Sequence, residues 1–266
     1  MKQFPFYIIF IILLSACKSE FESIRNSGDR ELMLNKALEF YDKKEYAKAQ
    51  ALFEVIIPFY RGREQAEDIF YKYAYTYYYG GEYITASHYF KNFANSFYNS
   101  PHREEMEYMA AYSHYLMSPN YRLDQTYTRK AIDEFQLFTN LYPNSDKIPL
   151  INNLIDEMRE KLERKAFESA ILYYNLGHYR AAVQTFDNVL QDYPGSPRSE
   201  EARFLKLKSS YILAENSIYE RKEERFDETL KFYSEFIKRH PRSRWMKEAR
   251  DIYNSSVKEL QKFGRV

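Results

Sequence analysis

The sequence predicts an all-α protein in which about five pairs of helices stack into a solenoid, closed by a C-terminal capping helix. Three observations predict this fold class: a small residue and an aromatic residue recur four positions apart, prolines follow at a fixed distance, and glycine is scarce. The 266 residues include seven glycines, under half of the usual share of about 7%. Glycine-rich phosphate loops and β folds dense in hairpins therefore have little material.

The small–aromatic pair marks the second helix of each predicted repeat, because residues four apart share one face of a helix. It occurs at Ala49/Phe53, Ala86/Phe90, Ala131/Phe135, Ala182/Phe186 and, more weakly, Thr229/Tyr233. Proline stands eight residues after the aromatic at Pro143, Pro194 and Pro241. Since proline cannot continue a helix, it ends one helix pair before the next begins. Stacking such pairs buries a continuous core.

This spacing resembles the tetratricopeptide repeat over most of residues 30–243. The expected units are 30–61, 64–100, 102–145, 148–196 and 198–243, followed by a capping helix from Trp245 to Lys262. The fourth unit is expected to begin with an unusually long helix, because an apolar stripe runs from Ile151 to Leu162 and continues toward Leu176. At 1.5 Å per residue that helix spans about 43 Å. It separates N-terminal repeats (30–145) from C-terminal repeats (146–266).

The N-terminus predicts a lipoprotein signal peptide. Lys2 precedes an apolar run from Phe4 to Leu14, which is too short to cross a bilayer, since a spanning helix needs about 20 residues. The run ends in Leu14-Ser15-Ala16-Cys17, which resembles the bacterial lipoprotein box. We therefore expect a signal peptide over residues 1–16, a lipid on Cys17, and a polar tether over residues 17–29. An ordinary signal peptide with an incidental cysteine is the alternative.

Composition argues against several classes of function. The formal net charge is +1, so the electrostatic drive toward nucleic acid is missing. The single cysteine can form neither an internal disulfide nor a thiolate metal cage. The five histidines are scattered, and no HExxH, GxSxG or GxGxxG motif occurs. We expect no catalytic residues, no metal and no cofactor.

Tyrosines form the first candidate binding surface. In the second unit the repeat pattern places Tyr73 and Tyr77 on the packing face, so the opposite face carries Tyr71, Tyr75, Tyr78 and Tyr79. The next unit repeats the pattern at Tyr108, Tyr112 and Tyr115. Tyrosine offers apolar area with few rotors and a hydroxyl that can bond to a backbone, which suits a groove for extended peptides. The alternative is that the N-terminal segment or a neighbouring repeat covers this face.

Basic residues around the sole tryptophan form the second candidate surface. Arg239, Arg242, Arg244 and Trp245 lie together near the C-terminus, with further cations at Lys238, Lys247 and Arg250. Tryptophan and arginine dominate the binding energy of many protein interfaces, which favours a docking site for a partner. Compensation of a helix dipole is the alternative.

Three stretches resemble the BamD family of outer-membrane lipoproteins. They are Tyr71 to Phe97, the segment from Asp124 through Ala131-Ile132-Asp133-Glu134-Phe135 to Tyr142-Pro143-Asn144-Ser145, and the segment from Tyr179-Arg180-Ala181-Ala182-Val183 to Asp192-Tyr193-Pro194-Gly195-Ser196. The resemblance implies a non-enzymatic, lipid-anchored subunit of the β-barrel assembly machinery that faces the periplasm from the outer membrane.

The same resemblance implies two partners. The last repeats would dock on the POTRA region of the barrel-inserting subunit, and the first repeats would bind unfolded outer-membrane precursors, whose terminal strands alternate aromatic and polar residues. A lipid-anchored repeat scaffold that organises cell-wall proteins is the alternative function, because the lipoprotein box and the repeats would suit it equally well.

Overall fold

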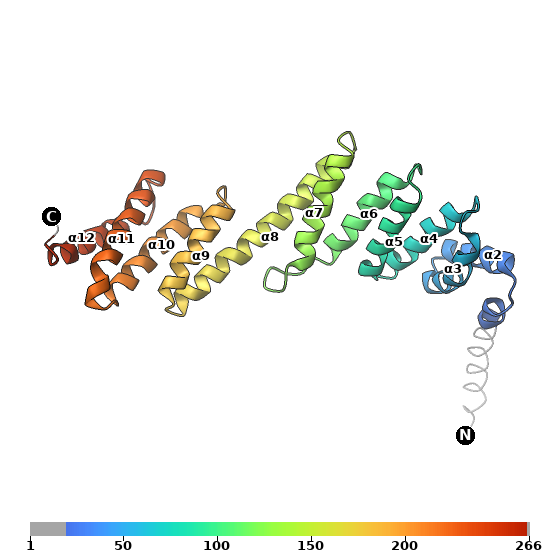
Figure 1. Ribbon diagram of the computed structural model, residues 1–266, viewed down its shortest axis with the longest axis horizontal. Helices are drawn as coiled ribbons and strands as arrows, with labels where there is room; N and C mark the ends of the chain where they lie inside the picture. Colours follow the sequence, from blue (N-terminus) through green and yellow to red (C-terminus); the bar gives the residue numbers. More distant parts are fainter. Residues whose placement is uncertain (1–19, 265–266) are drawn as a thin grey trace, which may run out of the picture. The chain divides into compact units, whose positions relative to one another are not determined.

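A computed structural model describes residues 20–264, and these residues form helices joined by short turns, with no strand among them (Figure 1). The helices pair in chain order, as the sequence predicts. The pairs are α2 (Arg30–Asp42) with α3 (Tyr46–Tyr60), α4 (Ala66–Tyr79) with α5 (Tyr83–Ser96), α6 (Arg103–Leu116) with α7 (Thr126–Leu141), α8 (Ile148–Asn175) with α9 (Tyr179–Asp192), and α10 (Ser199–Glu215) with α11 (Tyr219–Arg239), followed by α12 (Met246–Gln261). The all-α fold of five helix pairs and a capping helix is confirmed. The predicted signal peptide and Cys17 lie outside the described residues.

The chain divides into two compact units, and the division falls within α8. The first unit contains the described residues up to Pro119 together with Gln125–Ile155; the second contains Asn120–Asp124 and the residues from Asp156 on. The sequence placed the boundary between 145 and 146, before this helix. The helix is continuous over 28 residues, as its long apolar stripe predicted, so it contributes its first turns to one unit and its remainder to the other.

The repeated small–aromatic pairs fill the cores of both units. The first four pairs have no exposed surface, including Ala49 with Phe53 and Ala182 with Phe186. For the fifth, weaker pair, only the small residue is buried as predicted. Thr229 is fully buried, but Tyr233 is only half-buried, and the aromatic residues that fill this last repeat are Phe226 and Phe236.

The turn inside three of the helix pairs depends on one residue with a positive φ. Lys44, Gly81 and Gly177 have φ angles of 60°, 78° and 74°. Each lies just after a first helix, and the next backbone N–H donates to a carbonyl five residues earlier, as Glu82 N does to Tyr77 O at 2.9 Å. This left-handed position ends the helix and reverses the chain.

A serine organises the linkers between successive pairs. The hydroxyls of Ser100, Ser145, Ser196 and Ser243 each accept the N–H of the residue two positions on. The first three also donate to a glutamate of the preceding first helix, as Ser145 does to Glu104 at 2.6 Å. The later linkers have proline two residues before the serine, whereas the linker at Ser100 has Tyr98 at that position and proline at Pro101. Serine therefore defines the linker more generally than proline does.

The segment expected to be a tether is partly ordered, which corrects that expectation. Residues 20–25 are helical, and Phe21 and Ile24 pack against the core of the first unit. The ring of Phe21 lies 6.0 Å from the ring of Phe40. Because residues three apart share one helix face, these two apolar side chains are buried together. Residues 20–25 thus belong to the repeat domain, and any free tether is shorter.

Candidate functional site

Tyr75 is a core residue, so the expectation that it faces an open groove is wrong. Its side chain is 7% exposed, its ring lies 5.0 Å from that of Phe90 on α5, and its hydroxyl donates to Glu105 Oε1 on α6 at 2.5 Å. The face of α4 opposite Tyr73 is therefore enclosed by the next two helices. Burial, followed by the hydrogen bond to Glu105, raises the pKa of the Tyr75 hydroxyl well above its ordinary value.

Tyr71 and Tyr78 are half-buried and support the same region. The Tyr71 hydroxyl donates to Glu105 Oε1 at 3.0 Å, and its ring lies 4.7 Å from that of His102. Burial and the nearby Glu105 carboxylate raise the pKa of Tyr71 to about 12. Both rings are thus partly covered by their neighbours, and neither is fully free for a ligand.

An exposed tyrosine surface does exist, but it is narrower than the sequence suggested. Tyr79 is 50% exposed and stacks on Tyr46 with ring centroids 4.5 Å apart. On α6, the rings of Tyr108, Tyr112 and Tyr115 stack in one row at 5.6 and 5.5 Å, all half-buried. Tyr78 of α4 and both Tyr108 and Tyr112 of α6 pack against the same core cluster, so we treat the tyrosines of the two helices as one surface. We call Tyr46, Tyr78, Tyr79, Tyr108, Tyr112 and Tyr115 the tyrosine surface.

The predicted docking residues divide into exposed arginines and a packed tryptophan. Arg239, Arg242 and Arg244 are exposed. Trp245, the residue just before α12, is half-buried. Its ring stacks on that of Phe204 with centroids 5.2 Å apart, and the Arg244 guanidinium lies 4.0 Å from its ring centroid. Tryptophan here belongs partly to the core of the last repeat, so only part of its ring is available to a partner.

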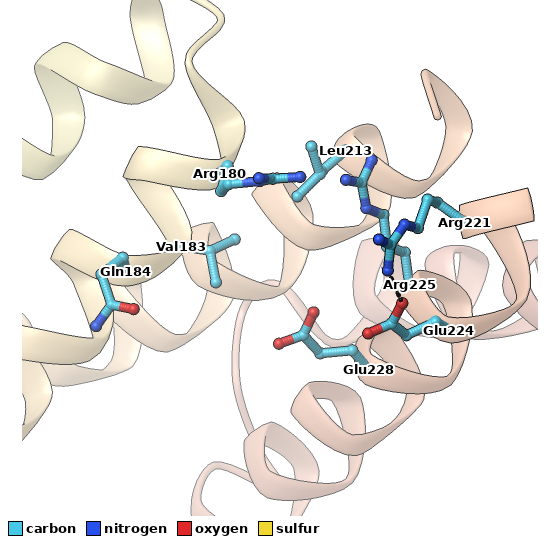
Figure 2. A pocket seen from close by; sticks show the side chains of 8 residues that line it. All are labelled: Arg180, Val183, Gln184, Leu213, Arg221, Glu224, Arg225 and Glu228. Atoms are coloured by element: carbon cyan, nitrogen blue, oxygen red, sulfur yellow. Dashed lines mark hydrogen bonds and ion pairs between the residues drawn. The ribbon is translucent and has the colours of Figure 1, made fainter. Parts of the chain in front are cut away.

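The second unit carries a pocket of about 400 Å³ that sequence reasoning passed over (Figure 2). It is lined by residues of α9, α10 and α11, namely Arg180, Val183, Gln184, Leu213, Arg221, Glu224, Arg225 and Glu228. Arg221 pairs with Glu224 at 3.0 Å, and Arg225 donates to Ser217. The spacing of 221, 224, 225 and 228 places these side chains on one helix face, and that spacing was the available signal.

A second pocket, of about 610 Å³, lies farther along the same three helices. Its lining residues are Asp187, Leu190, Gln191, Arg203, Lys206, Glu235, Lys238 and Arg239. Of this set, Lys238 and Arg239 were singled out from the sequence, as part of the basic cluster around Trp245. Lys206 is buried, and its ammonium lies 2.6 Å from Asp187 Oδ1.

A buried polar cluster in the first unit has residue types found in hydrolases but a different geometry. His114 Nδ1 lies 3.2 Å from Ser87 Oγ and 2.6 Å from Glu134 Oε2. A serine–histidine–acid relay uses both ring nitrogens, one toward each partner, whereas both contacts here involve Nδ1. Among residues 20–264, no three histidine, cysteine or acidic side chains are placed to hold a metal ion. Within the same residues, no helix combines the length and apolar character needed to span a membrane.

A family model described as "YfiO: Outer membrane lipoprotein" matches residues 27–225. The chain belongs to this family. A similar curated protein is the outer membrane protein assembly factor BamD of Rickettsia prowazekii (strain Madrid E), which is 24% identical over 235 residues, 88% of this chain and 89% of the relative. The resemblance to the BamD family found in the sequence is thereby confirmed.

Two further comparisons are with a second curated protein and with a solved structure. The putative outer membrane protein assembly factor BamD of Aquifex aeolicus (strain VF5) is 25% identical over 202 residues, covering 75% of this chain and 65% of the relative. A solved structure of TPR-like repeats from a Podosopora anserina putative kinesin light chain is 14% identical, covers 76% of this chain and 93% of that one, and has a TM-score of 0.32.

Proposed function

We propose that this YfiO family member is a non-enzymatic subunit of the outer-membrane β-barrel assembly machinery. It is held at the outer membrane by a lipid on Cys17 and faces the periplasm. Its N-terminal repeats bind unfolded outer-membrane precursors, and its C-terminal repeats dock on the POTRA region of the barrel-inserting subunit. The family match over residues 27–225 carries this proposal, with the names of the two relatives in its support.

The tyrosine surface suits the client-binding role. Its rings stack against one another, as Tyr108 and Tyr112 do at 5.6 Å, so little side-chain entropy is lost when a peptide covers them. Ring edges give apolar contact to the aromatic residues of a precursor strand, and hydroxyls such as that of Tyr79 bond to its backbone. Such contacts tolerate many sequences. Tyr71 and Tyr75 support this surface through Glu105 and do not touch the client.

The exposed arginines around Trp245 suit the docking role. Arg244 lies over a tryptophan ring that is already fixed against Phe204, and Arg239 and Arg242 are exposed nearby in the sequence. Tryptophan and arginine are the residues most often found at the energetic centre of protein interfaces.

Site-specific photo-crosslinking in cells tests both roles. A crosslinking amino acid at Tyr79 should give adducts with nascent β-barrel proteins, and one at Arg242 should give adducts with the barrel-inserting subunit. Leu137, which is 55% exposed and belongs to neither surface, is the control position. Adducts with cell-wall enzymes at Tyr79 and Arg242 would instead support a lipid-anchored scaffold and contradict the assembly role.

A further inference from the structure

The pocket of about 610 Å³ between α9, α10 and α11 holds more positive than negative charge. Four cations line it, and only two carboxylates, Asp187 and Glu235, accompany them. Both carboxylates face the buried Lys206, whose ammonium lies 2.6 Å from Asp187 Oδ1 and 3.8 Å from Glu235 Oε2. The two carboxylates therefore lie beside Lys206 and also act on Arg203, so four cations share two negative charges.

The other three cations, Arg203, Lys238 and Arg239, have no carboxylate within ion-pair distance among residues 20–264. Arg203 is half-buried, whereas Lys238 and Arg239 are exposed. A guanidinium that loses water without gaining an anion is destabilised. The pocket thus contains an unbalanced cationic group next to apolar Leu190.

Arg203 and Arg239 also repel each other. Burial lowers the pKa of Arg203 below its ordinary value, the nearby Arg239 lowers it further, and Glu235 and Asp187 oppose this in part. The same two arginines affect the adjacent His240. Burial lowers the pKa of the His240 ring, Glu200 raises it, and Arg203 and Arg239 lower it further. The two carboxylates offset the repulsion only in part, since the pKa of Arg203 stays lowered, so the excess positive charge leaves room for a ligand that neutralises both arginines.

We propose that this pocket binds a phosphoryl group between the guanidinium groups of Arg203 and Arg239, with Lys238 as a third contact. Guanidinium forks match phosphate oxygens in bidentate geometry. A phosphomonoester carries about −1.5 to −2 charges at neutral pH, so one such group balances both arginines, whereas one carboxylate balances only one. Leu190 offers apolar contact for the carbon attached to the phosphate.

The phosphoryl group can come from a lipid headgroup or from a soluble phosphomonoester. Both present the same oxygens to Arg203 and Arg239, and they differ in the acyl chains near Leu190. Arg239 belongs both to this pocket and to the proposed docking surface, but Tyr79 and Arg242, where the crosslinkers are placed, lie outside the pocket lining. Photo-crosslinking at Tyr79 and Arg242 can therefore succeed or fail independently of phosphate binding.

Calorimetric titration of the full chain, purified in detergent, tests the site. The ligands are inorganic phosphate, glycerol 1-phosphate and short-chain phosphatidic acid, with acetate as the carboxylate comparison, all at constant ionic strength.

Arg203→Gln and Arg239→Gln should each weaken phosphate binding by about tenfold or more, which corresponds to about 1.4 kcal/mol. Arg242→Gln and Lys247→Gln, which change exposed cations outside the pocket lining, should leave the affinity unchanged. Tighter binding of phosphatidic acid than of glycerol 1-phosphate assigns a lipid source, and equal affinities assign a soluble one.

Thermal melting gives a second readout that a merely structural role would not produce. Without phosphate, Arg239→Gln should raise the melting temperature, because it removes the repulsion on Arg203. At saturating phosphate the same variant should melt below the wild-type protein. Equal stabilisation of wild type and variants by phosphate, or equal affinity for acetate and phosphate, would overturn the proposal in favour of non-specific screening or an acidic protein partner.

Discussion

Tyr75 and Tyr79 lie one turn apart on α4, yet their surroundings differ because the neighbouring helices cover one and leave the other. Tyr75 contacts Phe90 and Glu105, whereas Tyr79 contacts mainly other tyrosines at the end of the helix. The repeat spacing identifies the face that packs within a helix pair. It says nothing about the face that the following pair encloses, and for that reason the sequence placed Tyr75 in the open groove.

The two tyrosines should therefore respond differently to truncation. Tyr75→Ala should lower the free energy of unfolding by about 3–5 kcal/mol, since it opens a cavity beside Phe90. Tyr79→Ala should cost about 1 kcal/mol or less, because half of its side chain is already in water. Denaturant unfolding of both variants measures the difference, and similar losses would show that Tyr79 is also structural.

Lys44 occupies a position that two glycines fill in equivalent turns. A left-handed backbone costs a residue with a Cβ about 1–2 kcal/mol, and replacing that residue with glycine removes this cost. Part of the resulting gain in stability is lost, because an unfolded glycine has greater conformational freedom. Lys44→Gly should therefore raise the free energy of unfolding by about 0.5–1 kcal/mol. Gly81→Ala is the matched control, because an added Cβ meets nothing within 4 Å. It should lower stability by a similar amount, and a gain from Gly81→Ala would contradict the turn argument.

At the scale of elements, Glu134 connects three helices through a buried ionic contact. It lies on α7, accepts from His114 of α6 at 2.6 Å, and pairs with Lys91 of α5. Burial alone raises the pKa of Glu134, but the hydrogen bonds from His114 and Lys91 outweigh it and hold the pKa below its ordinary value of 4.5. The ionised carboxylate therefore stabilises this part of the fold.

This contact predicts a pH dependence with a definite sign. A carboxyl group with a lowered pKa binds its proton more weakly when folded, so its contribution is complete above pH 4.5 and is lost as the pH falls below that value. Wild-type stability should fall more steeply below pH 4.5 than that of Glu134→Gln. Urea unfolding at several pH values measures both slopes. Glu64→Gln, at an exposed site, should follow the wild type; parallel curves for all three proteins would exclude a role for Glu134.

The elements themselves were predictable because their signals are local. Small residues at Ala49, Ala86 and Ala182, each with an aromatic residue four positions on, fixed the second helices. Proline was a less general signal, since the linker at Ser100 has Tyr98 at the position where the later linkers have proline. The pockets of the second unit were not predicted, because each combines single residues, such as Arg203 and Arg239, from three successive helices.

At the scale of the whole molecule, we predict that attachment to the membrane depends on Cys17. One acyl chain gives only marginal binding and several give a stable anchor, so Cys17→Ala should release the protein from the membrane while the repeat domain stays folded. Fractionation, followed by circular dichroism of the released chain, measures both effects. Recovery of the variant in a pellet that resists salt and alkali would contradict lipid anchoring.

The two compact units have separate aromatic cores, which predicts separate responses to core mutations. Phe186 is fully buried beside Phe167 in the second unit, and Phe53 is fully buried in the first. Stability in repeat proteins is approximately a sum of local terms between neighbours. Phe186→Ala should cost about 3–5 kcal/mol and should speed hydrogen exchange in α9 and α10, while α3 and α4 keep their protection. Phe53→Ala should show the reverse. Equal loss of protection in all four helices, in either variant, would show that the repeats unfold as one cooperative unit.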